Sequence, residues 1–399
     1  MLNCIVNCFL LFLEFRFRSF NICQSSINHI IILCHKVFQD FEYCFALEVE
    51  NQELLYHFQS QIKIDSTPKI LKLFICVLNF NYQQISPSLA PKDIQFVSFT
   101  FDDVRLSSGV EWLLSAFQAQ NAKFTLYPIA QNLISAQIRN IVHIAYINGH
   151  EIGSHSFSHQ NGYFDSDYWN GEINESLNML NKITNDTNGQ LNNISYFQIP
   201  IDTKRQNTYG FRAPFLKVNE DLLEIVKKTF LYDSSTHFDF CRIIKNRADC
   251  YYPFTLENVP KEAKPEFANI KQHKILEIPI STFIVPPYTL GFNLQLKYGK
   301  IIYGGDWTCW AELNMSAEEF NIIIRYTIEC HMNGNKAPVV LGLHSDYYTE
   351  EFDIENPQMK SNYIQRQQAL LDIIQYCNEL NLKIVRMDQL AAWMFDNTE

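Results

Sequence analysis

Side chains that bind metals or move protons occur at two short, well-separated points of the chain. Two adjacent carboxylates, Asp102 and Asp103, follow an apolar run, and two histidines, His155 and His159, are four residues apart. Two imidazoles and one carboxylate with coordination positions left open form the kind of site that holds a catalytic zinc ion. The second carboxylate could take a proton from the attacking water as a general base. Together these residues indicate metal-assisted hydrolysis.

Three further reactive residues stand by themselves in the sequence, and each has an ordinary explanation. Arg212 could be half of a structural ion pair, Asp233 could bond its own turn, and His344 could be a packed histidine. Asp102 and Asp103 could likewise cap a solvated turn at a strand end. A functional interpretation therefore depends on whether these residues are brought to one place by the fold.

Strands and helices are predicted to alternate from residue 94 onward. Runs dense in β-branched and aromatic residues predict strands at 94–101, 122–129, 150–156, 209–214, 231–235, 275–281, 339–344 and 382–385. Apolar residues at helical spacing predict helices at 107–120, 130–148, 168–185, 220–230, 316–333 and 364–379, the fifth with a capping box. Such alternation predicts parallel strands covered by helices, in a barrel or a doubly wound sheet.

The reactive residues gather at the predicted strand ends. Five clusters follow five different strands, and in a parallel barrel the carboxyl ends of the strands form one rim where chemistry collects. If the chain turns helically after the third strand, His155 and His159 share one face of that turn. Scattered structural residues would not favour a single rim.

The motifs, taken in order, resemble the polysaccharide deacetylases of carbohydrate esterase family 4, also called the NodB homology domain. The resemblance covers about residues 94–390 and rests on these segments: Thr-Phe-Asp-Asp at 100–103, His-Ser-Phe-Ser-His at 155–159, Arg-Ala-Pro-Phe at 212–215, Phe-Leu-Tyr-Asp-Ser-Ser at 230–235 and Leu-Gly-Leu-His at 341–344. It implies an α/β fold, a distorted (β/α)7–8 TIM-like barrel, within a catalytic domain at 91–399.

The resemblance also implies a metal site and a base. Asp103, His155 and His159 would hold a divalent ion, for which we expect zinc, with cobalt as the alternative. Asp102 would take the proton of the attacking water. Arg212 would orient Asp102 and hold it ionised.

The other side of the implied site concerns the substrate and the leaving group. A backbone N–H near Phe215 would stabilise the oxyanion, with Pro214 and Asp233 in the same substrate-facing motifs. His344 would protonate the leaving amine as the general acid.

The chain departs from the family pattern at several positions. Val104 stands where the family often has glycine after the paired aspartates. No carboxylate follows the 230–235 segment at the place where many bacterial members have the acid that tunes their catalytic histidine. The residues Asp239, Asp306 and Asp346 remain as alternatives. Three aromatic residues could stack on sugar rings or pack in ordinary loops: Tyr288, Trp307 and Trp310.

The first 90 residues are predicted to be an extension of the catalytic domain. Within it, residues 69–90 combine lysines, the apolar run 73–80 and small residues, which is typical of a signal peptide, although a buried strand would give the same pattern. The apolar run is too short to span a bilayer. Cys241 and Cys250 bracket a short polar loop, as a disulfide could. We therefore expect a secreted or extracellular protein without a membrane span.

The net charge and the similarity of two motifs limit the class of polymer that the protein is expected to bind. The net charge of −11 repels polyanions, so nucleic acid is an unsuitable ligand, and a neutral polymer or one that becomes cationic fits better. By the similarity of 212–215 and 230–235 to chitin deacetylases, we expect chitin or a chitin-like N-acetylglucosamine polymer. The alternatives are O-acetylated xylan, peptidoglycan, and a non-catalytic carbohydrate-binding protein on the same barrel. An amidohydrolase would carry a His-x-His pair at the first strand, where this chain has Asp-Asp.

Overall fold

The computed structural model describes residues 94–185, 208–236, 241–260, 274–287 and 301–396, all within the unit formed by residues 83–399. The expected extension 1–90, with its signal-like segment 69–90, lies outside the described residues and stays a prediction. In the described part of the chain, no helix is both long and apolar enough to cross a membrane.

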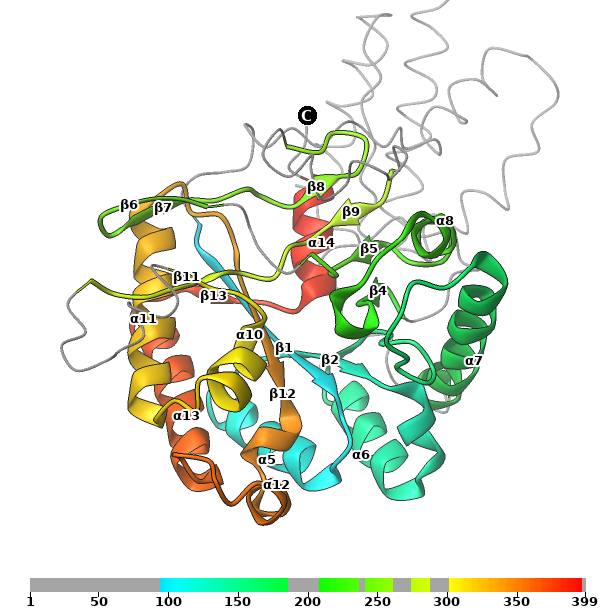
Figure 1. Ribbon diagram of the computed structural model, residues 1–399, viewed down its shortest axis with the longest axis horizontal. Coiled ribbons are helices and arrows are strands. Elements are labelled where there is room, and N and C mark those ends of the chain that lie inside the picture. The colour runs from blue at the N-terminus through cyan, green and yellow to red at the C-terminus, as the bar shows by residue number, and fades with distance from the viewer. Residues whose placement is uncertain (1–93, 186–207, 237–240, 261–273, 288–300, 397–399) are drawn as a thin grey trace, which may run out of the picture. The chain divides into compact units, whose positions relative to one another are not determined.

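Seven parallel strands surround the middle of the domain (Figure 1). They are β1 (Phe96–Asp103), β2 (Thr125–Pro128), β3 (Glu151–Ile152), β4 (Gly210–Phe211), β5 (Tyr232–Asp233), β9 (Leu276–Glu277) and β12 (Val339–His344). One sheet has the order β12-β1-β2-β3, and a second has β4-β5-β9 with the antiparallel β8 (Phe254–Thr255) at its edge. Strand β13 (Lys383–Ile384) pairs in parallel with the start of β1.

The two sheets are joined into a ring by backbone hydrogen bonds at single residues. Ser154, just after β3, donates to the carbonyl of Gly210 and accepts from the amide of Arg212, both at 2.9 Å. On the other side Ser281, just after β9, donates to the carbonyl of Val340 in β12 at 2.9 Å. The α/β fold expected from the sequence is therefore present as a ring of parallel strands, and its distortion consists of these two narrow junctions.

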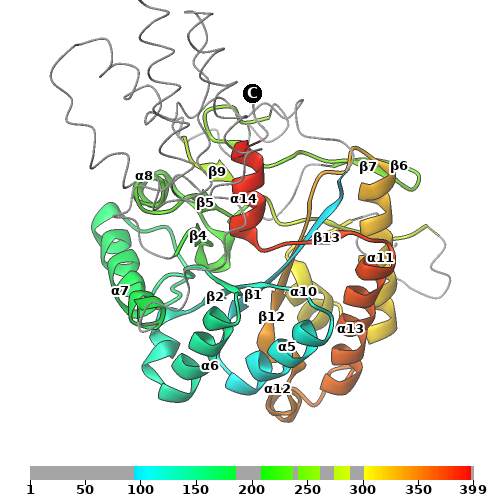
Figure 2. The same ribbon diagram turned by 180° about the vertical axis from the view of Figure 1, so that it is seen from behind.

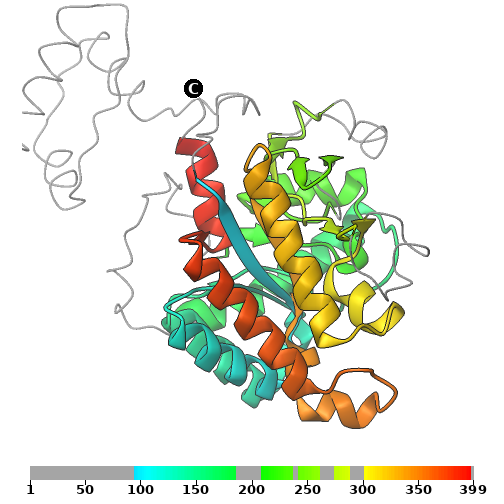
Figure 3. The same ribbon diagram turned by 90° about the vertical axis from the view of Figure 1, so that its left-hand side faces the viewer.

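The helices pack around this ring. They are α5 (Ser107–Ala119), α6 (Ala136–Ile147), α7 (Ser166–Asn185), α8 (Glu220–Thr229), α11 (Ala317–Asn333), α13 (Tyr363–Glu379) and α14 (Met387–Asp396). Seen from behind, α5, α6 and α13 cover the outer side of β1 and β2 (Figure 2). Helices α11 and α13 lie side by side (Figure 3), and Asn321 of α11 donates to the carbonyl of Ala369 in α13.

The two-residue period of β1 separates the core from the site. Phe99 and Phe101 point outward, where both rings pack edge-on against Phe117 of α5. Thr100 and Asp102 point into the ring, where both accept a hydrogen bond from the same arginine. The apolar side chains of the strand thus anchor it, and the alternate polar ones face the site.

Most of the predicted elements occur, with differences at their ends. The capping box of α11 is present, because Ser316 accepts from the amide of Glu319 and the Glu319 side chain accepts from the amide of Ser316. The helix expected at 130–148 is two pieces, a 3-10 turn at Ala130–Ile134 and then α6, because Ser135 has extended backbone angles. Most strands are shorter than predicted.

The stretch between the strands predicted at 231–235 and 275–281 contains short strands that the sequence did not predict. An antiparallel hairpin of β6 (Arg242–Ile244) and β7 (Arg247–Asp249) is closed at its base by a disulfide between Cys241 and Cys250. Further elements found only in the structure are β10 (Phe283–Ile284), β11 (Ile301–Ile302), α10 (Gly305–Trp307), α12 (Glu350–Glu355) and α14.

Candidate active site

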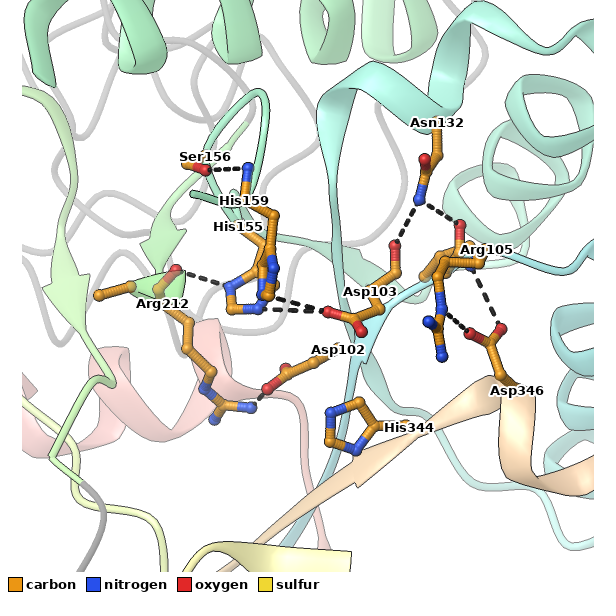
Figure 4. A network of polar contacts seen from close by, with 12 residues as sticks. Asp102, Asp103, Arg105, Asn132, His155, Ser156, His159, Arg212, His344 and Asp346 are labelled. Atoms are coloured by element: carbon orange, nitrogen blue, oxygen red, sulfur yellow. Dashed lines mark hydrogen bonds and ion pairs between the residues drawn. The ribbon is translucent and has the colours of Figure 1, made fainter. Parts of the chain in front are cut away.

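The register of β1 and β12 places the first two site residues opposite each other. Asp102, the last residue but one of β1, is paired in the parallel ladder with His344, which ends β12. Asp103 follows directly at the mouth of the ring. His155, Arg212 and Asp233 stand at the ends of β3, β4 and β5, so the predicted rim of strand ends is what the structure forms (Figure 4).

The chain leaves β1 through a strained turn. Asp103 and Val104 have φ angles of 68° and 54°, a left-handed region that a β-branched residue rarely adopts and a glycine adopts without strain. Three hydrogen bonds stabilise this turn. The Asn132 side chain donates to the carbonyls of Asp103 and Val104, each at 3.3 Å, and the Ile129 amide donates to Asp103 at 3.0 Å. The turn aims the Asp103 carboxylate at the two histidines.

Three potential ligand atoms converge at Asp103. Its Oδ1 lies 3.6 Å from His155 Nε2 and 3.4 Å from His159 Nε2. These atoms all lie within 4.8 Å of one another, and Asp103 Oδ1 is buried with no hydrogen-bond donor among the described residues. A buried carboxylate oxygen faced by two ring nitrogens is costly unless a cation lies between them.

The two histidines are brought together by a loop and not by the helical turn that would also bring them close. Ser156 and His159 have positive φ angles of 61° and 55°, which fold the five residues back on themselves. Glu172 of α7 holds this loop by accepting from the amides of Phe157 at 3.0 Å and Ser158 at 2.8 Å. The spacing of four residues correctly indicates that the two rings are close, but a folded loop and not a helix brings them together.

The hydrogen bonds and charges of the ligand atoms suit a divalent ion. His155 Nδ1 lies 2.8 Å from the carbonyl oxygen of Arg212, which can only accept, so Nδ1 carries the proton and Nε2 presents its lone pair to Asp103. Burial and the neighbouring His155 lower the pKa of His159 to about 4, which keeps that ring neutral. Burial would raise the pKa of Asp103, but nearby positive charge, foremost that of His344, lowers it below its usual value. A carboxylate with two neutral imidazoles is the donor set of a catalytic zinc site.

Arg212 fixes the second carboxylate. The guanidinium is fully buried, and its Nη1 donates to Asp102 Oδ1 at 2.7 Å and to Thr100 Oγ1 at 2.8 Å. Its Nε donates to the Ser234 carbonyl at 3.0 Å, and the Tyr127 ring lies 4.4 Å beneath it. With so many partners the guanidinium holds Asp102 in one orientation, off the three converging ligand atoms.

The third motif presents a backbone donor and an aromatic ring. Pro214 begins a short 3-10 turn, and Phe215 within it has a φ angle of 52°. The Phe215 ring is half exposed and lies 4.7 Å from the His159 ring. Within the described ranges, no backbone acceptor outside this turn is found for the Phe215 N–H.

Asp233 supports this motif from below. Its carboxylate is 1% exposed and accepts from Ser235 Oγ at 2.6 Å, and Ser235 Oγ accepts from the Ala213 amide at 2.8 Å. Burial raises the pKa of Asp233 above its usual value. The structure thus places Asp233 against the protein rather than at the substrate surface where the sequence suggested it.

His344 has a carboxylate partner that the sequence left open. Asp306 Oδ1 lies 2.7 Å from His344 Nδ1, and Asp306 Oδ2 accepts from the His344 amide at 2.9 Å. Asp346, one of the alternatives, pairs with Arg105 instead, and Asp239 lies outside the described residues. Burial would lower the pKa of His344, but the charge and hydrogen bond of Asp306 raise it to about 9.

Two of the aromatic residues considered for sugar stacking are placed differently from each other. Trp307 is half exposed beside Asp306, where a sugar ring could reach it. Trp310 is 1% exposed and packs against Phe320 with ring centroids 4.5 Å apart, so stacking on a substrate is wrong for Trp310. Tyr288 lies outside the described residues.

The pair of His344 and Asp306 predicts a pH effect. The imidazolium is the form that donates a proton, so His344 with a pKa of about 9 remains an acid below that pH and is lost as an acid above it. In Asp306→Asn this pKa falls towards 6.5, and the alkaline limb of kcat/KM moves to lower pH. Profiles of kcat/KM against pH for the wild type, Asp306→Asn and the surface control Asp249→Asn measure the shift. An alkaline limb that stays in place in Asp306→Asn would contradict this role.

Comparisons with known proteins show which family part of this chain resembles. Residues 90–232 match the family model described as polysaccharide deacetylase. A comparison with curated protein sequences finds no match. The matched segment includes Asp102, Asp103, both ligand histidines and Arg212, whereas His344 and Asp306 come later in the chain.

Several solved structures resemble the chain at low identity. A polysaccharide deacetylase structure from Mycobacterium smegmatis is 16% identical, covers 77% of this chain and 94% of its own, and has a TM-score of 0.48. A family 4 acetyl xylan esterase from Clostridium thermocellum, in complex with a cobalt ion, is 14% identical with coverages of 74% and 90% and a TM-score of 0.40. A CE4 family pseudoenzyme from Bacillus anthracis is 11% identical with coverages of 77% and 69% and a TM-score of 0.39. Over residues 90–232, this chain is therefore similar to the polysaccharide deacetylase family.

Proposed function

We propose that the protein hydrolyses N-acetyl groups of a chitin-like N-acetylglucosamine polymer and that this activity depends on a divalent metal. One observation carries the proposal. The convergence of Asp103, His155 and His159 is flanked by Asp102, held by Arg212, and by His344, held by Asp306. A metal site with a base and an acid beside it is the equipment that amide hydrolysis requires.

Asp103, His155 and His159 would hold the ion, for which zinc is our proposal. When bound, the ion polarises the acetyl carbonyl and makes a water more acidic. The chain itself supplies the geometry around it, because the Arg212 carbonyl orients His155 and the loop at 155–159 is held by Glu172. The Arg212 carbonyl and Glu172 thus orient the histidines that would bind the ion, and neither group would bind the ion itself.

The residues of the chain divide the proton transfers between two sides. Asp102 accepts the proton of the attacking water, and its contact with Arg212 keeps the accepting oxygen in place. The Phe215 N–H donates to the oxygen on which negative charge develops. His344, kept protonated by Asp306, donates to the departing nitrogen, which would otherwise leave as an unstable amide anion.

The choice of an amino-sugar polymer rests on charge and on exposed rings. The net charge of −11 suits a polymer that becomes cationic as acetyl groups are removed. The exposed ring of Phe215 lies beside His159, and the exposed ring of Trp307 belongs to the residue that follows Asp306. Sugar faces could stack on both rings. The disulfide between Cys241 and Cys250 supports our further proposal that the protein is secreted.

A substrate panel tests this proposal. Purified full chain is incubated with an N-acetylglucosamine tetramer, acetylated xylan and peptidoglycan, and released acetate is measured against Asp102→Asn. We expect faster release from the tetramer than from xylan, because the tetramer's leaving group is an amine that needs the acid His344, whereas xylan releases an alcohol. Faster release from xylan or peptidoglycan would show that the proposed substrate is wrong. No release from any of the three would favour a non-catalytic carbohydrate-binding protein.

A further inference from the structure

A second arginine lies at the mouth of the site and has no part in the mechanism above. The Arg105 side chain is 58% exposed, and its Nε donates to Asp346 Oδ2 at 2.8 Å. Asp346 is buried to 1% exposure, and its Oδ1 accepts from the backbone amides of Arg105 at 3.2 Å and Leu106 at 3.1 Å. A buried carboxylate therefore fixes both the backbone and the side chain of Arg105.

This anchoring leaves one end of the guanidinium free. Asp346 takes Nε, and across the described ranges neither terminal nitrogen of Arg105 has a hydrogen-bond acceptor. A long exposed arginine ordinarily samples many rotamers, and that freedom is lost when it binds a ligand. Because Asp346 already restricts Arg105, its terminal N–H groups are preorganised donors aimed away from the buried carboxylate.

The position of this donor relates it to the reacting groups. Arg105 is two residues beyond Asp103, and Asp346 is two residues beyond His344, on the strands whose register pairs Asp102 with His344. Figure 4 shows the guanidinium between Asp103 and Asp346, on the side of the site where His344 lies. Its charge also acts on Asp103. The free donors thus lie on the same side of the candidate site as His344.

The chemistry of the substrate decides what such a donor can recognise. An N-acetylated sugar carries a carbonyl oxygen, which accepts hydrogen bonds, whereas a deacetylated sugar carries an ammonium group, which only donates. A guanidinium donates a hydrogen bond to the carbonyl oxygen of the N-acetylated sugar. It repels the ammonium group of the deacetylated sugar and offers that group no acceptor. The overall charge of −11 would attract a cationic polymer to the protein as a whole, so Arg105 acts against that attraction at one place.

We propose that Arg105, held by Asp346, determines specificity by binding the N-acetyl carbonyl of the sugar unit next to the reacting one and rejecting a glucosamine unit there. This inference rests on the proposed function. It implies that acetyl groups beside an existing free amine are removed slowly, so that deacetylation is scattered along the polymer. From the charge repulsion at a distance of several ångströms, the discrimination is about tenfold in kcat/KM.

The test compares two ligands and four proteins. The ligands are the fully acetylated N-acetylglucosamine tetramer and the same tetramer with one internal glucosamine, at a pH where the amine is protonated. The proteins are the wild type, Arg105→Gln, Arg105→Lys and Arg247→Gln. Arg247 is a matched control, because it is 55% exposed, pairs with Asp249 at 2.9 Å and lies in the β6–β7 hairpin. That hairpin bonds to the segment preceding β12, at the opposite end of this strand from His344.

The wild type and Arg247→Gln are expected to prefer the acetylated tetramer about tenfold, and Arg105→Gln to lose most of that preference. Arg105→Lys should keep the part of this preference that comes from charge repulsion of the amine. It should lose the part that comes from the fixed N–H donors of the guanidinium. High salt should weaken the preference of the wild type and leave that of Arg105→Gln unchanged. Equal preference in the wild type and Arg105→Gln would overturn the proposal.

A binding measurement separates this inference from the function on which it rests. Calorimetric titration of both tetramers is repeated with the full chain carrying Asp102→Asn, alone and combined with Arg105→Gln. If the wild type releases no acetate but the ratio of the two affinities still depends on Arg105, the proposed reaction fails and the specificity role stands. If the ratio does not depend on Arg105, or neither tetramer binds, the specificity role is refuted.

Discussion

Replacing Asp102 by asparagine is expected to lower kcat/KM for acetate release by about 10²- to 10⁴-fold, the usual contribution of a general base. The asparagine side chain keeps an oxygen that can accept from Arg212 Nη1, now 2.7 Å from Asp102 Oδ1, but it cannot take a proton from water. Asp102 is not among the three converging ligand atoms, so the bound metal should remain. The measurements are acetate release and metal content of the purified variant.

The control for this variant must address stability. Arg212 is fully buried, and a buried charge whose partner is lost costs several kcal/mol of unfolding free energy. Thermal unfolding of Asp102→Asn and of the surface variant Asp249→Asn therefore accompanies the assay. A folded, metal-containing Asp102→Asn with wild-type turnover would remove Asp102 from the mechanism.

Replacing His159 by alanine is expected to weaken metal binding by about 10²-fold or more and to abolish acetate release at low metal concentration. One of three ligand atoms is lost, and Asp103 and His155 alone leave the ion held by two. Activity should return in part when excess metal is supplied, because the base and the acid are untouched. Titration of metal with turnover as the readout measures both effects.

His143→Ala is the matched control for His159→Ala. His143 lies on α6, where its Nδ1 bonds the Ile183 carbonyl at 2.8 Å, and it belongs to no ligand cluster among the described residues. This variant should keep its metal affinity. Equal affinity in His159→Ala and the wild type would mean that the ion, if bound, is held elsewhere.

The rim of reactive residues could be predicted from the sequence because it depends on local patterns. The alternation in β1 puts Asp102 on the inner side of a strand whose other side is phenylalanine, and strand ends of a parallel ring meet at one edge. The same holds for the capping box that begins α11, since its two partners are three residues apart. Periodicity and short spacing carry this information.

The remaining features depend on contacts that are distant in sequence or on backbone angles. Asp306 reaches His344 across 38 residues, and nothing near either residue distinguishes it from Asp346. The left-handed angle of Val104 belongs to a β-branched residue type that rarely adopts it, so no propensity indicates it. A glutamate on α7, Glu172, supports the ligand loop from 14 residues away.

The most direct measurement is acetate release by the wild-type chain from the N-acetylglucosamine tetramer before chelation, after chelation and after zinc is returned. The account predicts about one metal ion per chain, loss of turnover when it is removed, and recovery when one equivalent is restored. Turnover that persists in protein shown to contain no metal would contradict it, because Asp103, His155 and His159 would then face one another for some other reason.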